Sequence, residues 1–352
     1  MLVGLCGGIC AGKRSVAKYL VQKHNFRILQ LATEACQPAH FDAVDQLHLQ
    51  SGAMADTPAQ VFQSADDLVL FITARWQEHW VITDLSNESL LEKLLLRPFF
   101  LLVSIDAPIT LRWRRFTDRC WRKQLEPPEL ERFVLLNDQH QYQHKNGVVY
   151  VDAHAHIRLF NASSSIHDLH AALDALDILN HQRLRPSWDE YFMQLASLAA
   201  QRSNCMKRRV GCVLVKDRRV MSTGYNGTAR NTRNCNQGGC PRCNLVQGTA
   251  QALSTCLCLH AEENALLEAG RERIGEGCIL YCNTCPCLTC SVKIAQLGIS
   301  EVVYSQAYDM DRETAAILEE AGVKLRQFSP PCNGLIDIRF MFKQSCIQES
   351  PE

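Results

Sequence analysis

The chain has 352 residues, which is enough for two domains of ordinary size. Its 37 Lys and Arg residues balance 37 Asp and Glu residues, and this zero net charge argues against nucleic acid as the main partner, because no overall basic field exists. No stretch is apolar enough to span a membrane and residues 1–8 lack the features of a signal peptide, so we expect no membrane partner and a cytoplasmic location, with the nucleus as an alternative.

The N-terminal part alternates predicted strands and helices around a glycine-rich turn. Residues 2–6 read as a strand, residues 7–13 follow the spacing G-x-x-x-x-G-K, a helix comes next, and residues 99–108 read as a buried strand ending in a turn. The candidate phosphate-loop residues are Gly7, Gly12, Lys13 and Ser15. A phosphate-binding loop needs Ser or Thr directly after the lysine to hold magnesium, but Arg14 stands there. The turn resembles that of nucleotide and dephospho-coenzyme A kinases, and the missing hydroxyl favours a degenerate P-loop-like domain over an active kinase.

A polar, proline-containing junction at residues 183–188 follows a predicted helix at 173–179 and divides the chain. We assign 1–182 to the first domain, 183–330 to the second and 331–352 to a C-terminal tail. Beyond the junction the sequence predicts a helix at 188–201, a hairpin of strands at 210–215 and 220–224, strands at 279–281, 301–305 and 323–328, and a helix at 313–321. This alternation predicts a mostly parallel sheet with helices on both faces, an α/β domain of three layers.

The second domain contains His260-Ala261-Glu262, followed by Pro286-Cys287-Leu288-Thr289-Cys290. A catalytic zinc keeps one tetrahedral position open for water, and His260, Cys287 and Cys290 would supply the other three ligands. Glu262 can then take the proton from that water, pass it to a ring nitrogen and protonate the leaving ammonia. This order of residues is the signature of zinc-dependent nucleobase deaminases. The alternative is a set of scattered structural residues, but a purely structural zinc site has no need of Glu262.

The local sequence predicts helices on either side of this candidate metal site. Residues 260–269 read as a helix closed by Gly270, and Pro286 opens a second helix at 287–297 that stops at Gly298. The N-termini of both helices would therefore meet at the metal. Their free amides and positive dipole ends suit thiolates and a developing negative charge.

Four longer segments make a family resemblance specific. They are residues 202–211 (RSNCMKRRVG), 223–228 (TGYNGT), 234–243 (NCNQGGCPRC) and 256–262 (CLCLHAE). With these segments, residues 184 to 328 resemble the deoxycytidylate (dCMP) deaminase family, and the whole chain looks like its fungal members, which carry an N-terminal extension. The resemblance implies a cytidine-deaminase-like α/β/α domain preceded by the P-loop-like one.

The resemblance also implies substrate-binding roles. Asn226, in a Gly-rich turn, should hydrogen-bond the deoxyribose, although an ordinary hairpin turn is the alternative. Backbone groups around Ala261 and Cys285 should contact the cytosine edge. Arg208 is the candidate for the phosphate, among a cluster of neighbouring polar residues, and Tyr308 is a candidate to cover the phosphate or the ring.

A second metal site is implied by the cysteines. Fourteen of the 18 cysteines lie at or after Cys205, and in a chain with no signal peptide this clustering indicates reduced thiols and metal. By resemblance, the ligands of a structural zinc are Cys205, Cys235, Cys240 and Cys256. Cys243 and Cys258 also lie close in sequence, so the fourth ligand stays open, with Cys243 as the alternative. Reduced cysteines without metal are the remaining interpretation.

The activity implied is zinc-dependent hydrolysis of dCMP to dUMP, which supplies dTMP synthesis. Members of the family are also implied to be homo-oligomers, often hexamers, activated by dCTP, with Mg²⁺ accompanying this effector, and inhibited by dTTP. Two other functions stay open: a tRNA or other nucleobase deaminase, and a zinc-stabilised interaction protein whose active site has decayed. Nucleotide kinase activity of the first domain is a separate alternative.

Overall fold

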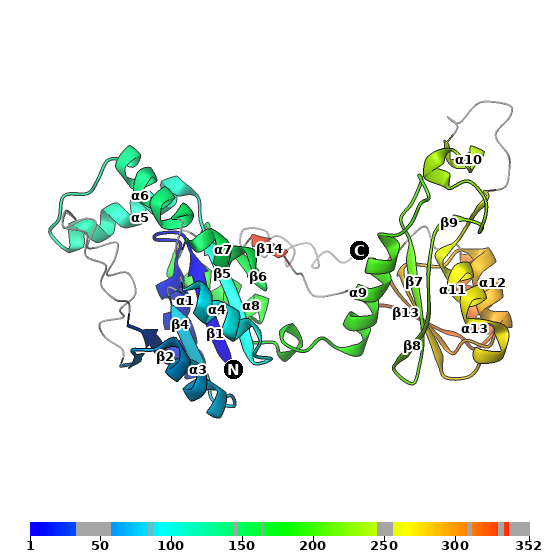
Figure 1. The fold of residues 1–352 in the computed structure, drawn as a ribbon, viewed down its shortest axis with the longest axis horizontal. Coiled ribbons are helices and arrows are strands. Elements are labelled where there is room, and N and C mark those ends of the chain that lie inside the picture. Colours follow the sequence, from blue (N-terminus) through cyan, green and yellow to red (C-terminus); the bar gives the residue numbers. More distant parts are fainter. Residues whose placement is uncertain are drawn as a thin grey trace, which may run out of the picture. The chain divides into compact units, whose positions relative to one another are not determined.

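The computed structural model describes residues 1–32, 58–83, 85, 87–143, 147–163, 165–244, 256–307, 312–329 and 334–337 (Figure 1). Its contacts divide the chain into two compact units, one built on Met1–Arg185 and the other on Pro186–Pro331. The division falls inside the proline-containing junction. Tyr308, expected near the substrate, lies outside the described residues. Among the helices that can be described, none is both long and apolar enough to cross a membrane.

The N-terminal unit is organised around a seven-stranded sheet in the order β14-β6-β5-β1-β4-β2-β3, in which every pairing is parallel. Its strands are β1 (Leu2–Gly7), β2 (Arg27–Leu31), β3 (Ala59–Phe62), β4 (Trp80–Thr83), β5 (Phe100–Asp106), β6 (Ile157–Phe160) and β14 (Gly334–Asp337). The assignment of residues 331–352 to a separate tail is therefore wrong for β14. This short strand pairs with β6, because an edge strand offers unpaired backbone groups that a later segment can complete.

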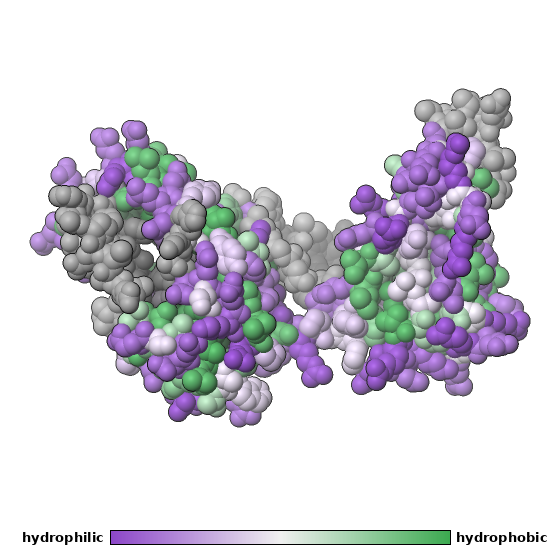
Figure 2. Space-filling view, viewed as in Figure 1, coloured by the Kyte–Doolittle hydropathy of each residue, from purple (hydrophilic) through white to green (hydrophobic). Residues whose placement is uncertain are grey.

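Helices cover both faces of this sheet. They are α1 (Lys13–His24), α3 (Ala65–Ala74), α4 (Glu88–Leu95), α5 (Ile109–Arg122), α6 (Leu130–Tyr142), α7 (Val148–Ala153) and α8 (Ile166–Leu176), followed by the 3-10 turn η1 (His181–Arg183). Alternate residues of β1 point to opposite sides: Val3 packs with α1 and α8, whereas Leu2 packs with α3, α4 and α7. The unit is thus a three-layer α/β/α domain. Figure 2 shows that its visible surface is largely hydrophilic, as expected when helices turn their apolar sides to a sheet.

The C-terminal unit has a five-stranded sheet in the order β13-β12-β11-β7-β8. Its strands are β7 (Gly211–Lys216), β8 (Arg219–Tyr225), β11 (Cys278–Thr284), β12 (Glu301–Gln306) and β13 (Lys324–Gln327), and β9 (Gly227–Thr228) pairs separately with β10 (Cys258–Leu259). Strands β11, β12 and β13 are parallel, but β7 is antiparallel to both β8 and β11. The predicted hairpin of β7 and β8 is present, and the antiparallel pairing of β7 with β11 is the departure from the mostly parallel sheet that was predicted. A two-residue turn joins β7 to β8, and so short a connection reverses the chain direction.

The helices of this unit lie on both sides of the sheet. They are α9 (Trp188–Ala200), α10 (Pro241–Asn244), α11 (Ala261–Ala269), α12 (Leu288–Gln296) and α13 (Arg312–Glu320), with 3-10 turns η2 (Cys235–Gln237) and η3 (Arg271–Arg273). Helix α9 packs on one face through Phe192, Met193 and Ala196. Helices α11, α12 and α13 pack on the other, so the expected three layers are present.

Glycines allow two of these helices to approach the sheet backbone closely. A Cβ atom on Gly211 of β7 would lie 2.1 Å from the carbonyl oxygen of Ala196 in α9. A Cβ atom on Gly224 of β8 would lie 2.0 Å from the carbonyl oxygen of Ala261 in α11. No side chain fits in either position. The second contact fixes the first turn of α11, where the His-Ala-Glu motif begins, against the sheet.

Candidate zinc active site

His260, Cys287 and Cys290 converge at the N-termini of two helices. His260 is the N-cap residue of α11 and Cys287 is the N-cap residue of α12, so the predicted meeting of two helix starts is observed. His260 Nδ1 lies 3.3 Å from Cys287 Sγ and 3.4 Å from Cys290 Sγ. Tetrahedral zinc with ordinary Zn–N and Zn–S bonds places such atoms about 3.6 Å apart. One nitrogen and two sulfurs at these distances fit a zinc ion with a fourth position open.

The candidate acid–base residue lies next to these ligands. Glu262 is in the first turn of α11, and only 3% of its surface is exposed. Burial raises the pKa of the Glu262 carboxyl, with the nearby His260 acting in the opposite direction. Hydrogen bonds from Cys290 and His260, opposed by burial, lower the pKa of Cys287 to about 3, and a thiolate is the form that binds metal. The buried Glu262 carboxyl therefore lies beside side chains that can bind a metal ion.

Two residues that hold the ligands in place were not identified from the sequence. The Glu263 carboxylate accepts a hydrogen bond of 2.9 Å from the backbone N–H of His260 and pairs with Lys293 of α12. It thereby connects the two helices that carry the ligands. Thr289 Oγ1 lies 3.2 Å from Cys287 Sγ. The spacing of Glu263 three residues after an N-cap position is a capping-box pattern, which is the signal that would have found it.

The structure places Asn226 beside the motif. Its side chain is buried, with Oδ1 accepting a hydrogen bond of 2.8 Å from the Ala261 N–H and Nδ2 lying 3.4 Å from the Arg208 carbonyl oxygen. The N–H of Cys285 donates to the carbonyl of Gln306 at 3.0 Å. The amides of Ala261 and Cys285, expected to contact cytosine, are thus engaged within the protein. Contacts between these two residues and cytosine would therefore have to use their other atoms.

Six cysteines form a second cluster, from the loop after α9 to the strand β10. They fall into two sets of four whose sulfur atoms lie within 4.8 Å of one another: Cys205, Cys235, Cys243 and Cys258, and Cys240, Cys243, Cys256 and Cys258. The four expected ligands are divided between these sets, with Cys205 and Cys235 in the first and Cys240 and Cys256 in the second, and the alternative Cys243 belongs to both. The pairing of β10 with β9 brings Cys258 into the cluster, and this contact between segments distant in sequence could not be read from spacing.

The glycine-rich turn of the N-terminal unit folds around its own lysine. Lys13 is buried, and its Nζ donates to the carbonyl oxygens of Gly7 at 2.8 Å and Gly8 at 3.1 Å. Gly7 and Gly12 both have positive φ, which explains glycine there. The guanidinium of Arg112 lies directly over Gly8. Ser15 lies within α1 and is partly exposed.

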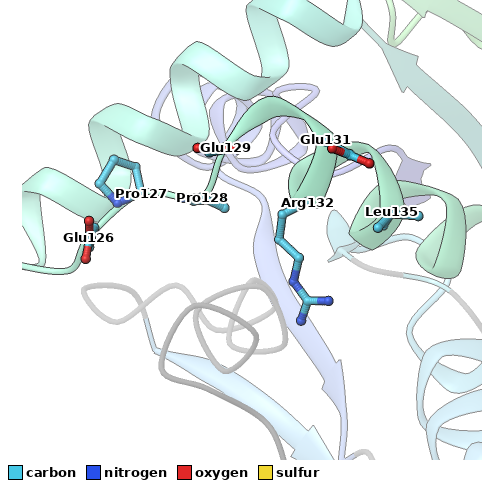
Figure 3. Close-up of a pocket in the computed structure, with 7 residues that line it drawn as sticks. All are labelled: Glu126, Pro127, Pro128, Glu129, Glu131, Arg132 and Leu135. Atoms are coloured by element: carbon cyan, nitrogen blue, oxygen red, sulfur yellow. The ribbon is translucent and has the colours of Figure 1, made fainter.

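A surface pocket of about 480 Å³ also lies in the N-terminal unit (Figure 3). It is formed where α5 and α6 are connected, by Glu126, Glu131, Arg132, Leu135 and their neighbours. None of the predicted site residues lines it. In Figure 3 the Arg132 side chain extends away from α6, Glu129 and Glu131 lie near the top of the view, and Glu126 lies apart from them at the left. The pocket is therefore distinct from the site formed by His260, Cys287 and Cys290.

Comparisons with known proteins agree with this geometry. Residues 186–306 match the family described as the cytidine and deoxycytidylate deaminase zinc-binding region. The chain is 50% identical over 333 residues to the deoxycytidylate deaminase of Schizosaccharomyces pombe, covering 95% of this chain and 99% of that one. It is 49% identical over 298 residues to the enzyme of the same name from Saccharomyces cerevisiae, covering 81% of this chain and 90% of that one.

A solved structure of dCMP deaminase from the cyanophage S-TIM5, in complex with dCMP and dUMP, is 29% identical, with a TM-score of 0.34. It aligns with 41% of this chain and 98% of the phage chain. The two fungal relatives extend over both units, so the N-terminal unit is shared as well. Sequence identity of 50% to the Schizosaccharomyces pombe protein along nearly the full length of both chains shows common descent. The chain belongs to the zinc-dependent cytidine and deoxycytidylate deaminase family.

Proposed function

We propose that this chain hydrolyses dCMP to dUMP and ammonia. The observation that carries the proposal is the convergence of His260, Cys287 and Cys290 beside the buried Glu262, in a chain half identical to deoxycytidylate deaminases. His260, Cys287 and Cys290 would hold a zinc ion. When bound, zinc supplies a Lewis acid that lowers the pKa of a water molecule.

Glu262 carries the proton transfers in this proposal. Hydrolysis at ring carbon 4 needs a base for water, an acid for the ring nitrogen and an acid for the departing amine. One carboxyl can serve all of these steps: it takes the first proton from water and gives it to the ring nitrogen, then takes the second proton from the hydroxyl now attached to carbon 4 and gives it to the departing amine, which leaves the carboxylate as it began. Burial excludes competing water from Glu262. The hydrogen bond that the His260 backbone N–H donates to the Glu263 carboxylate keeps the motif in position while the proton moves.

Asn226 and Arg208 are the proposed contacts to the sugar and phosphate. Arg208 precedes β7 and Asn226 directly follows β8, at the end of the hairpin opposite its turn, and Asn226 Nδ2 lies 3.4 Å from the Arg208 carbonyl oxygen. An amide with two donors and an acceptor can bind a sugar hydroxyl while retaining its contact with Ala261. The guanidinium of Arg208 is suited to a phosphate monoester.

Rates with dCMP, deoxycytidine and CMP test the substrate. We expect kcat/KM to be highest for dCMP, because the other two lack the phosphate or carry an additional hydroxyl. Equal rates with deoxycytidine would contradict the phosphate requirement. Competition by an RNA stem-loop would favour the alternative polynucleotide deaminase, and wild-type activity in Glu262→Ala would favour a non-catalytic zinc protein.

The resemblance to the deaminase family extends the proposal to the regulation and the oligomeric state of the protein. We propose a homo-oligomer, a hexamer in the first instance, activated by dCTP together with Mg²⁺ and inhibited by dTTP, in the cytoplasm. Hyperbolic dCMP kinetics that neither triphosphate changes would contradict the regulation. A single-chain mass in solution would contradict the oligomer.

The N-terminal unit is proposed as a degenerate P-loop-like nucleotide-binding domain. Support comes from Arg112 and Arg115, which lie against the glycine-rich turn. The Arg115 guanidinium donates to the carbonyl of Ala11 at 3.2 Å, and Arg112 lies over Gly8. ATP turnover that disappears in Lys13→Ala would instead establish an active kinase.

A further inference from the structure

We propose that Cys205, Cys235, Cys240, Cys243, Cys256 and Cys258 bind two zinc ions in one binuclear cluster, next to the catalytic zinc site. The two sets of four cysteines share Cys243 and Cys258. Each set alone provides the closed tetrahedron of a structural zinc. Two tetrahedra that share two sulfurs need six thiolates, which is the number present, and the shared thiolates then bridge the metals.

The sulfur–sulfur distances match shared tetrahedra. Zinc bonded to sulfur at about 2.3 Å places neighbouring sulfurs about 3.8 Å apart. In the first set, Cys205 and Cys243 are 3.8 Å apart. In the second, Cys256 lies 3.6 Å from Cys240 and 3.5 Å from Cys243. The proposed bridging pair, Cys243 and Cys258, is 4.0 Å apart. All exceed the disulfide bond length of about 2.05 Å, so the thiols are grouped without being oxidised.

A single zinc ion would leave this arrangement incomplete. If one ion occupied the first set, Cys240 and Cys256 would remain as unligated thiols, and occupation of the second set would leave Cys205 and Cys235. Both sets carry the same supporting contact. The N–H of Met206 lies 3.4 Å from Cys235 Sγ, and the N–H of Leu257 lies 3.4 Å from Cys240 Sγ. Amide donors aimed at a terminal sulfur favour the thiolate, and each set has one.

The local fold also needs these metals. Among the described residues, the hydrophobic cluster of this region consists of the six cysteines alone. Elements η2 and α10 have three and four residues, too few to bury an apolar core. Small segments without a core are commonly stabilised by metal. Cys258 lies in β10, two residues before His260, so the cluster would also fix the start of the catalytic motif.

Zinc content of the purified full-length chain, measured after saturation under reducing conditions and removal of loose metal, tests the proposal. We expect three zinc ions per chain, and two in Cys287→Ser, which loses a catalytic ligand. Cys120→Ala, which changes a buried cysteine of the other unit, is the matched control and should retain three. Two ions in the wild type and one in Cys287→Ser would overturn the proposal, because they leave a mononuclear cysteine site.

Cadmium substitution followed by ¹¹³Cd NMR tests the bridging directly. Two metals that share sulfurs should give two resonances that are coupled to each other, whereas isolated tetrahedral sites give uncoupled resonances. We expect the coupling in Cys287→Ser as well, because the catalytic ligand is not part of the cluster. Uncoupled resonances at full occupancy would overturn the proposal. This inference does not depend on the substrate, so its tests can fail or succeed independently of the tests of dCMP deamination.

Discussion

The side-chain oxygen of Asn226 accepts a 2.8 Å hydrogen bond from the backbone N–H of Ala261. This contact joins the residue that directly follows β8 to the first turn of α11, between His260 and Glu262. The Asn226 side chain caps an otherwise unpaired amide at a helix start. It therefore has a structural role in addition to the sugar contact proposed for it.

Asn226→Ala and Asn226→Asp separate these roles. Alanine leaves a buried N–H unsatisfied, so we expect the free energy of unfolding of the C-terminal unit to fall by about 1–3 kcal/mol. Aspartate keeps the acceptor oxygen at a helix N-terminus, where negative charge is tolerated, and should largely retain stability. Thermal unfolding and the KM for dCMP are the measurements. Equal stability of the alanine variant and the wild type would contradict the capping role.

Glu262→Gln should stop catalysis while leaving the metal bound. Glutamine has nearly the same shape but cannot accept and return a proton, so kcat should fall by at least about 100-fold. Zinc content should stay at the wild-type value, because Glu262 is not a ligand. Activity and zinc content measured on the same sample check this. Loss of zinc together with activity would show that Glu262 holds the metal instead.

The convergence of His260, Cys287 and Cys290 beside Glu262 could be predicted from sequence, because the chemistry proposed for them fixes both residue type and order. The helix starts at His260 and Cys287 followed from local signals in the same way. The antiparallel pairing of β7 with β11, the pairing of β14 with β6, and the division of the cysteines into two overlapping sets could not be predicted. Each depends on contacts between segments far apart in the chain, which hydrophobic periodicity does not encode.

Glu263→Ala should weaken zinc binding at the catalytic site. Removing Glu263 frees both the His260 N–H and Lys293, so the two ligand-bearing helices lose their connection. Loss of a residue that orients a ligand usually lowers metal affinity by about 10–100-fold. Competition with a chelator, read as zinc retained by the catalytic site, measures the effect. Lys293→Met is the matched control: it keeps the His260 contact and should lose less affinity. If both variants bound zinc like the wild type, Glu263 would have no orienting role.

Gly224→Ala should destabilise the C-terminal unit and reduce activity. The added methyl would lie 2.0 Å from the Ala261 carbonyl oxygen and 2.5 Å from the Ala265 nitrogen, so α11 must move. Overpacking of this kind costs about 1–3 kcal/mol. Gly275→Ala adds the same methyl where no atom lies within 4 Å and should change stability by less than about 0.5 kcal/mol. Denaturant unfolding compares the two, and indistinguishable curves would disprove the close packing.

We expect Asp189 to make the stability of the C-terminal unit sensitive to acid. Arg326 Nη1 and Nη2 donate to its carboxylate at 2.8 and 3.1 Å, and Tyr281 donates at 2.8 Å. The Arg326 hydrogen bonds, more than Tyr281 and against burial, hold the pKa of Asp189 below its ordinary value. A carboxyl with a depressed folded-state pKa adds stability above its unfolded value of about 3.9, and this contribution is lost as pH falls through the folded-state pKa.

Asp189→Asn should therefore lower the free energy of unfolding by about 1 kcal/mol at pH 7, where the carboxylate is charged. The difference from the wild type should shrink below about pH 4, because the wild-type carboxyl is then protonated. Urea unfolding at several pH values from 7 to 3 measures this, with Glu272→Gln as the control that removes an exposed carboxylate of the same unit. A difference that stays constant across this range would show that Asp189 contributes by packing and not by charge.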